Sequence, residues 1–243
     1  MKRAREIEKG SEIKSAIEEL SMLIKLKPTV DNHDRTTVHI PTRPFIYVCN
    51  LVIQVLDKIG PTMAVLRQDI DQNIQRLKML CDSDPSMYSN LVEILKKEAD
   101  EGSARKGASC SKASVWLARS LDFTAALLQR LVVDPDQKME QLVEESYNTT
   151  LKPWHGWISS AAYRVLIRAL LLSSLVSQNL NIAAVALKLV PDSKTFINLL
   201  MPNDETYDTL KEDVETLTSL LVPFLEEIHS VLILYGLDRL KST

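Results

Sequence analysis

Three polar residues of complementary chemistry recur at helical spacing in the first third of the chain. Asp69, Asn73 and Arg76 occupy positions i, i+4 and i+7, which would align them along one stripe of a helix. A carboxylate, an amide and a guanidinium together accept and donate hydrogen bonds, so the stripe suits a ligand that carries hydroxyl or phosphate groups. Taken alone, such a stripe is more typical of an ordinary solvated helix face. Beside it runs an apolar stripe that comprises Leu66, Ile70, Ile74 and Leu77.

A lysine and a tryptophan follow near the start of a long apolar segment. Trp116 comes four residues after Lys112, so the two side chains would share a helix face. An indole can stack on the apolar face of a sugar ring while its N–H donates a hydrogen bond, and the lysine adds a cation. Because large aromatic side chains are more often core residues, Trp116 alone favours the simpler interpretation of packing.

The third feature is the run Trp154-His155-Gly156-Trp157, directly after Pro153. Proline is favoured in the first turn of a helix, so we predict that a helix opens here. His155 would then lie in that first turn, where exposed backbone N–H groups favour a neutral imidazole that can hydrogen-bond a ligand. A structural histidine between two tryptophans is the simpler alternative.

Sequence signatures of common enzyme classes are missing. The chain has no GxSxG, HExxH or GxxxxGK[ST] pattern and no glycine-rich loop between a strand and a helix. Cys49, Cys81 and Cys110 are spaced about 30 residues apart without CxxC spacing, which fits neither a zinc site nor a disulfide framework and suits reduced thiols. We therefore expect no enzymatic activity, no metal and no cofactor.

Composition narrows the fold class and the partners. In 243 residues, 45% are hydrophobic and 25% charged, as in globular proteins, while only 6 glycines and 5% aromatics argue against β-sandwiches. A net charge of −3 provides no positive field for nucleic acid, so none is expected as a partner. The charged N-terminus lacks the apolar core of a signal peptide, which together with reduced thiols predicts a cytosolic protein.

Apolar residues repeat at steps of three and four along most of the chain, which predicts helices. No strand-like alternation is sustained over six residues, and we expect an all-α fold with several layers of packed helices. The most apolar stretch, residues 165–190, includes charged and amide side chains that a membrane-spanning helix rarely tolerates. Helices are expected at 8–26, 44–59, from the Gly60-Pro61 break to 81, and at 91–100, 111–132, 137–151, from 153 onward, 193–200 and 205–234.

The three features occur in a specific order along the chain. They lie in the stretches RQDIDQNIQRL (67–77), SVWLARSL (114–121) and LKPWHGW (151–157). An Asp, three residues and an Asn, followed by Trp-Leu-x-Arg and a late His-Gly-Trp, resembles the pattern of the glycolipid transfer protein family. The resemblance covers residues 43–243 and is strongest to plant members.

This resemblance implies a single-domain, two-layer all-α sandwich that holds one sphingolipid, with its chains in an apolar tunnel and its headgroup in a surface site. Asp69 and Asn73 would hydrogen-bond the sugar hydroxyls, and Asp69 would also reach the ceramide amide N–H. Arg76 would donate to the headgroup, Trp116 would stack under the first sugar, and His155 would bind the ceramide amide carbonyl.

The implied activity is non-vesicular transfer of a sphingolipid between membranes. Exposing lipid chains to water costs about 0.8 kcal/mol per CH₂, so a protein that shields them accelerates exchange without bond chemistry. Trp116 favours a neutral sugar, as in glucosylceramide. Lys112 and Arg76 are cations that suit a phosphate, so ceramide-1-phosphate transfer is an alternative. In the family branch that carries this lipid, the Trp116 position and the one a turn earlier look like arginines, which bind phosphate. A sphingolipid sensor or adaptor without fast transfer is a further alternative.

The expected organisation divides the chain at residue 43. Residues 1–43 would form an N-terminal helix and a variable loop, and residues 44–243 the transfer domain. About 20 residues at 166–185 exceed the family pattern, either as a lengthened, looped-out helix or as a segment that damages the pocket wall. We expect a monomer that contacts membranes transiently, with Trp154 either at the membrane surface or simply packed.

Overall fold

The computed structural model describes residues 11–26, 38–60, 63–155, 191–201 and 205–241. Within these ranges the chain is helical and forms no β-strand, only an isolated bridge between Pro41 and Asn90. This confirms the predicted all-α class. The elements are α1 (Glu12–Leu26), α2 (Thr42–Ile59), α3 (Ala64–Ser83), α4 (Leu91–Asp100), α5 (Cys110–Val133), α6 (Met139–Thr150), the 3-10 turn η2 (Lys152–Trp154), α9 (Ser193–Leu200) and α10 (Tyr207–Leu234).

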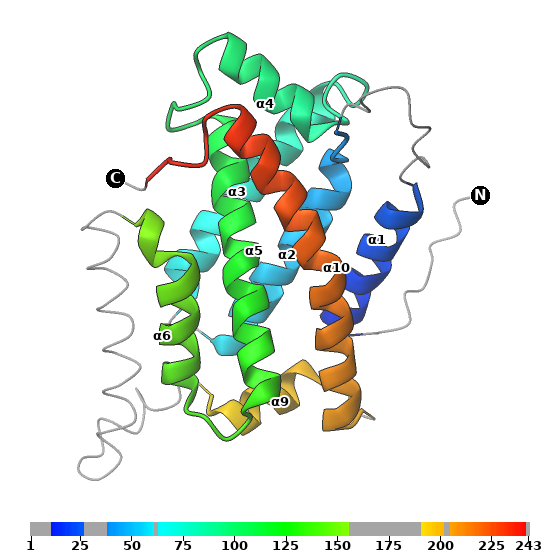
Figure 1. Ribbon diagram of the computed structural model, residues 1–243, viewed down its shortest axis with the longest axis vertical. Coiled ribbons are helices and arrows are strands. Elements are labelled where there is room, and N and C mark those ends of the chain that lie inside the picture. Colours follow the sequence, from blue (N-terminus) through cyan, green and yellow to red (C-terminus); the bar gives the residue numbers. More distant parts are fainter. Residues whose placement is uncertain (1–10, 27–37, 61–62, 156–190, 202–204, 242–243) are drawn as a thin grey trace.

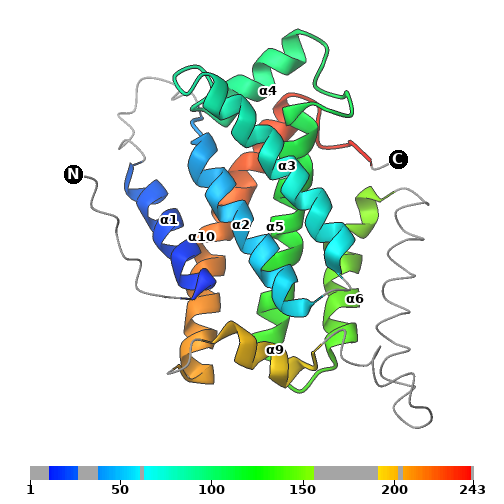
Figure 2. The same ribbon diagram turned by 180° about the vertical axis from the view of Figure 1, so that it is seen from behind.

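The described helices form two layers. In Figure 1, α5, α6 and α10 stand in front, with α2 and α3 behind them, and Figure 2 shows the same arrangement from the other side. The layers meet where α3 and α2 pack on α5, while α1 contacts both α2 and α10. The short helices α4 and α9 cross the two ends (Figure 1). This is the two-layer sandwich expected from the family resemblance.

α5 is the central helix of this arrangement. Apolar residues such as Leu117, Leu121 and Leu128 are fully buried, and most of its other positions are buried as well. Its start is fixed from two sides. The Ser109 side chain caps the helix, and Glu98 of α4 accepts hydrogen bonds from the first backbone N–H groups of α5. The first turns of α5, which carry Lys112 and Trp116, are therefore firmly oriented.

The polar stripe of α3 is positioned by its apolar neighbour. Ile70, Ile74 and Leu77 are buried in the core, where α3 packs on α5. Because the apolar stripe of α3 faces the core, the polar stripe beside it must lie along the edge of the α3–α5 contact. The predicted break before this helix is also present, since α2 ends at Ile59 and Gly60 adopts a φ of 112° that favours glycine.

The first and last helices complete the core. The buried Ile13, Ala16 and Leu20 of α1 face α2 and α10, so this helix belongs to the same core as the rest of the chain. α10 is long and apolar enough to cross a membrane by length and composition, but such a test is also passed by core helices. Because α10 packs along both α5 and α1, we interpret it as a core helix of the sandwich.

The start of one predicted helix differs in the structure, and the rest of that helix lies outside the described residues. The expected helix from Pro153 onward begins as the 3-10 turn η2, with Pro153 in its first positions, but this turn ends at Trp154. His155 follows it with an extended backbone, φ −77° and ψ 131°, rather than within a first helical turn. The inserted segment 166–185 lies outside the described residues, as does the part of the predicted variable loop at 27–37.

Candidate functional site

The polar residues of α3 form a connected group. Asn73 is buried, Arg76 is half-buried, and Asp69 faces solvent. The Arg76 guanidinium donates to the Asn73 Oδ1 at 3.1 Å. Although Asp69 is exposed, desolvation by the neighbouring protein raises its pKa, and the positive charges of Arg76 and Lys112 oppose this rise. A buried asparagine bonded to an arginine is not an ordinary solvated helix face, which was the simpler interpretation of this stripe.

α5 supplies the next two predicted residues. Lys112 is half-buried and lies close enough to Asp69 for its charge to act on that carboxylate. Trp116, one turn later, is also only half-buried, so it is not a wholly enclosed core residue. Its ring lies 5.6 Å from the His155 ring, with the two planes inclined by 36°. Trp116 therefore lies next to the residue that follows η2.

His155 lies among three side chains from two helices. Its Nδ1 is 3.1 Å from the Tyr147 hydroxyl of α6, and the two rings are 5.4 Å apart. Burial lowers the pKa of His155, and the nearby Arg119 charge lowers this pKa further. The predicted neutral imidazole is thus favoured, but the predicted cause is wrong. The lowered pKa of His155 arises from desolvation and a neighbouring cation, not from helical N–H groups.

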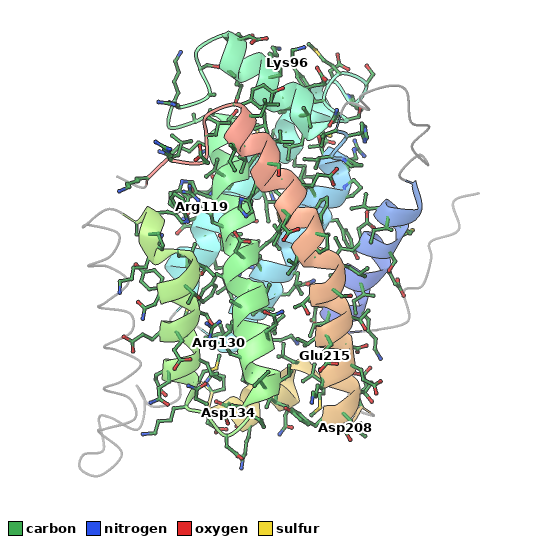
Figure 3. All side chains as sticks on the ribbon, viewed as in Figure 1. Lys96, Arg119, Arg130, Asp134, Asp208 and Glu215 are labelled. Carbon is green, nitrogen blue, oxygen red and sulfur yellow. The ribbon has the colours of Figure 1, made fainter. Side chains whose placement is uncertain are left out.

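Arg119 and Tyr147 had no role in the sequence-based prediction. Arg119 is only 3% exposed. Its guanidinium carbon lies 5.0 Å from the centre of the Trp116 ring and 4.1 Å from that of Trp154. Figure 3 places it on α5 near the upper end of α6. A charged residue amid the apolar positions of a core helix is the signal that could have drawn attention to it.

The six predicted residues fall into two sets that α5 joins. Asp69, Asn73 and Arg76 interact on α3, whereas His155 contacts Trp116. On α5, Lys112 lies near the α3 set, and Trp116, one turn later, contacts His155. We call Trp116 and His155 the headgroup platform, after the role that the family resemblance predicts for them. Acceptors, donors, an aromatic face and a neutral imidazole thus lie near the first turns of α5, and such groups can bind hydroxyls and an amide.

Trp154 packs in part against α5. Its ring is half-buried and lies against the Arg119 guanidinium. The contact with Arg119 describes the packed part of the ring, and contact of Trp154 with a membrane stays a prediction.

Comparison with known families gives a direct result. The family model for the glycolipid transfer protein (GLTP) matches residues 40–180, more than half of the chain. The chain belongs to the glycolipid transfer protein family.

Full-length relatives and solved structures agree with this assignment. Glycolipid transfer protein 3 of Arabidopsis thaliana is 54% identical over 96% of this chain and 93% of its own length. Glycolipid transfer protein 2 of Arabidopsis thaliana is 54% identical over 100% of both chains.

Two solved structures show the fold. The GLTP fold with which FAPP2 selects simple glycosphingolipids superimposes with a TM-score of 0.73 at 18% identity, covering 96% of this chain and 100% of that one. Arabidopsis ACD11 complexed with ceramide-1-phosphate gives a TM-score of 0.73 at 15% identity, over 95% of this chain and 100% of that one. The GLTP fold of this family member is therefore established.

The described residues also line a hollow away from the headgroup platform. A cavity of about 520 Å³ opens near the end of α5, between α6 and α10. Arg130 and Glu145, which form an ion pair of 3.6 Å, both line it, as does Glu215. Figure 3 shows Arg130 and Glu215 toward the lower end of the molecule and Arg119 toward the upper end. We therefore treat it as separate from the candidate site.

Within the described part of the chain, no group of three or more His, Cys, Asp or Glu side chains could hold a metal ion. The cysteines are free and buried. Burial raises the pKa of Cys110 to about 12 and that of Cys49 well above its usual value, so both stay protonated thiols.

Proposed function

We propose that this protein is a carrier that transfers one sphingolipid at a time between membranes, without making or breaking covalent bonds. One observation carries the proposal. On neighbouring turns of α5, Lys112 lies near the α3 polar group and Trp116 contacts His155. The names of its relatives support the same activity, since those at 54% identity are glycolipid transfer proteins.

Donor and acceptor logic supports the proposed role of α3. A guanidinium can only donate, so the Asn73 oxygen must be the atom that faces Arg76. The Asn73 amide hydrogens are then directed elsewhere and can donate to a sugar hydroxyl. Asp69, exposed beside them, can accept from the hydroxyls and from the ceramide amide N–H.

The polarity of the site favours a neutral sugar over a phosphate. The start of a helix is a common phosphate-binding element, because its backbone N–H groups are unpaired. In α5 these groups are already used, since the N–H groups of Cys110 and Ser111 donate to Glu98 at 2.9 and 2.7 Å. A phosphate would also meet the Asp69 carboxylate, whereas sugar hydroxyls can use it. We infer that glucosylceramide is the preferred cargo.

His155 is suited to bind the ceramide amide carbonyl. When the Tyr147 hydroxyl donates to Nδ1, that nitrogen is the acceptor and Nε2 carries the proton. Burial and Arg119 disfavour a second proton. A neutral imidazole with its Nε2–H directed outward is the donor that a carbonyl oxygen requires.

The lipid chains require an apolar space between the layers. Phe45 of α2 and Phe224 of α10 meet there, with ring centres 6.4 Å apart. We infer that the lipid chains enter by separating such side chains. The removal of each CH₂ from water contributes about 0.8 kcal/mol, and this free energy drives the entry.

The proposal is tested by the transfer of fluorescent glucosylceramide between vesicles. Asp69→Asn keeps the shape of the side chain but removes its charge, and Trp116→Ala removes the stacking face. An unmatched polar group costs about 1–3 kcal/mol, so Asp69→Asn should lower the initial rate about 5- to 150-fold, and the loss of the stacking face should lower the rate of Trp116→Ala as well. Asp71→Asn, on the same helix, is the matched control and should transfer normally. Wild-type rates in both site variants would contradict the site assignment.

Two alternatives are distinguished by the same vesicles. If ceramide-1-phosphate moves faster than glucosylceramide, Lys112 and Arg76 dominate the choice of headgroup. If either lipid binds tightly but does not move between vesicles, the protein is a sensor or adaptor. We expect faster transfer of glucosylceramide.

We further propose that the carrier works as a monomer in the cytosol and touches membranes only transiently. The net charge of −3 favours only a modest dependence on anionic lipid. The transfer domain is proposed to span residues 44–243, with residues 166–185 as an atypical insertion. Light scattering in solution and vesicle flotation test the monomer and the transient contact.

A further inference from the structure

Arg119 belongs to the Trp-Leu-x-Arg motif, yet none of the proposed lipid contacts uses it. A buried guanidinium needs partners, because leaving its charge unpaired in the interior is costly. Burial lowers the pKa of Arg119 to about 10, so it remains charged at neutral pH. Two of its partners are the aromatic faces of Trp116 and Trp154.

The remaining partners come from the C-terminal segment, which we define as residues 237–241. Arg119 Nη1 donates to the Leu240 carbonyl at 2.6 Å, and Nη2 donates to the Asp238 carbonyl at 2.7 Å. The segment reaches Arg119 because Gly236, with a φ of 65°, ends α10 and turns the chain. The buried Leu237 then holds the turn in the core.

One guanidinium therefore joins the end of the chain to the headgroup platform. It contacts Trp116 directly, and its charge acts on His155. The fork geometry of arginine allows it to bond two carbonyls and stack on a ring at once, which lysine cannot do. Among the described residues, the titratable or charged groups that face His155 are Arg119 from α5 and Tyr147 from α6.

We propose that Arg119 is a positioning residue that ties the C-terminal segment to the headgroup platform and holds Trp116 and His155 in the arrangement that binds lipid. This inference rests on the proposed transfer function. It assigns the carboxyl-terminal residues a role in transfer although they need not touch the lipid.

Three variants test this link. Arg119→Gln removes the cation and the paired donors, whereas a chain ending at Leu237 removes both acceptor carbonyls and leaves Arg119 in place. Arg105→Gln is the matched control. Arg105 donates to the Gly236 carbonyl at 3.0 Å, and within the described residues it does not stack on Trp116 or Trp154 as Arg119 does. Glucosylceramide transfer is measured on folded protein, as judged by thermal unfolding.

Arg119→Gln and the truncation should each lower the transfer rate at least tenfold, and the combination should lower it no further. Arg105→Gln should stay within twofold of wild type. NMR titration of His155 separates loss of the Arg119 charge from general loosening, because loosening would raise the pKa of His155 in the truncated chain as well, whereas that chain keeps the cation. Its pKa should rise in Arg119→Gln, because the neighbouring cation is gone, and should not change in Arg105→Gln.

Wild-type transfer by the truncated chain, or an unchanged His155 titration in Arg119→Gln, would overturn the proposal. If Arg119→Gln does not fold, the truncated chain decides by its transfer rate, since it keeps Arg119 and the buried Leu237. A wild-type protein that moves no glucosylceramide would contradict the proposed function instead, and the His155 titration would still decide whether Arg119 acts on the platform.

Discussion

Replacing Glu98 with alanine should destabilise the protein and loosen the start of α5. The Glu98 carboxylate accepts from the Cys110 and Ser111 N–H groups at 2.9 and 2.7 Å, within the first turn of the helix. Hydrogen bonds to charged groups contribute about 1.5–3 kcal/mol each, but water can replace part of this at a half-buried site. Interaction with the helix dipole adds about 0.3–1 kcal/mol.

These terms predict a loss of about 2 kcal/mol in the free energy of unfolding for Glu98→Ala. In a protein of this size, this corresponds to a fall of about 4–8 °C in Tm. Glu98→Gln, which keeps an acceptor oxygen but not the charge, should lose about half as much. Urea unfolding and thermal unfolding measure both values.

Glu101→Ala provides the control, because Glu101 is exposed at the end of the same helix. It should change stability by no more than about 0.5 kcal/mol. The freed N–H groups of α5 should also increase the transfer of ceramide-1-phosphate relative to glucosylceramide. Equal stability of Glu98→Ala and Glu101→Ala would refute the assignment of Glu98 as the anchor of α5.

Three further predictions follow from the site and its surroundings. Tyr147→Phe keeps the ring beside His155 but removes the hydroxyl, and should lower glucosylceramide transfer about two- to tenfold, since a neutral hydrogen bond contributes about 0.5–1.5 kcal/mol. Because the pKa of His155 is lowered on folding, the unfolded chain takes up the proton first, so stability should fall as the pH drops below about 6.5. Urea midpoints at pH 7 and pH 5 measure this loss, which should be smaller in His155→Gln. Deleting residues 166–185 tests the insertion: retained transfer means a looped-out segment, and increased transfer means one that obstructs the pocket.

Helical spacing is a local property, which explains what could be predicted from the sequence. Asp69, Asn73 and Arg76 share a face because any helix aligns positions four and three residues apart. The buried Ile70 and Ile74 identify the inward face of the same helix for the same reason. The order of the motifs added the family, which the family model and the full-length relatives confirm.

The sequence alone thus determined the all-α class, the helices and the residue types of the site. Only the tertiary structure decided how those residues act on one another, because the deciding contacts join positions far apart in the chain. Arg119 bonds the carbonyls of residues 119 and 121 positions later, and Glu98 caps a helix 12 positions away. The neutral state of His155 likewise depends on burial and on a cation from another helix, which spacing cannot reveal.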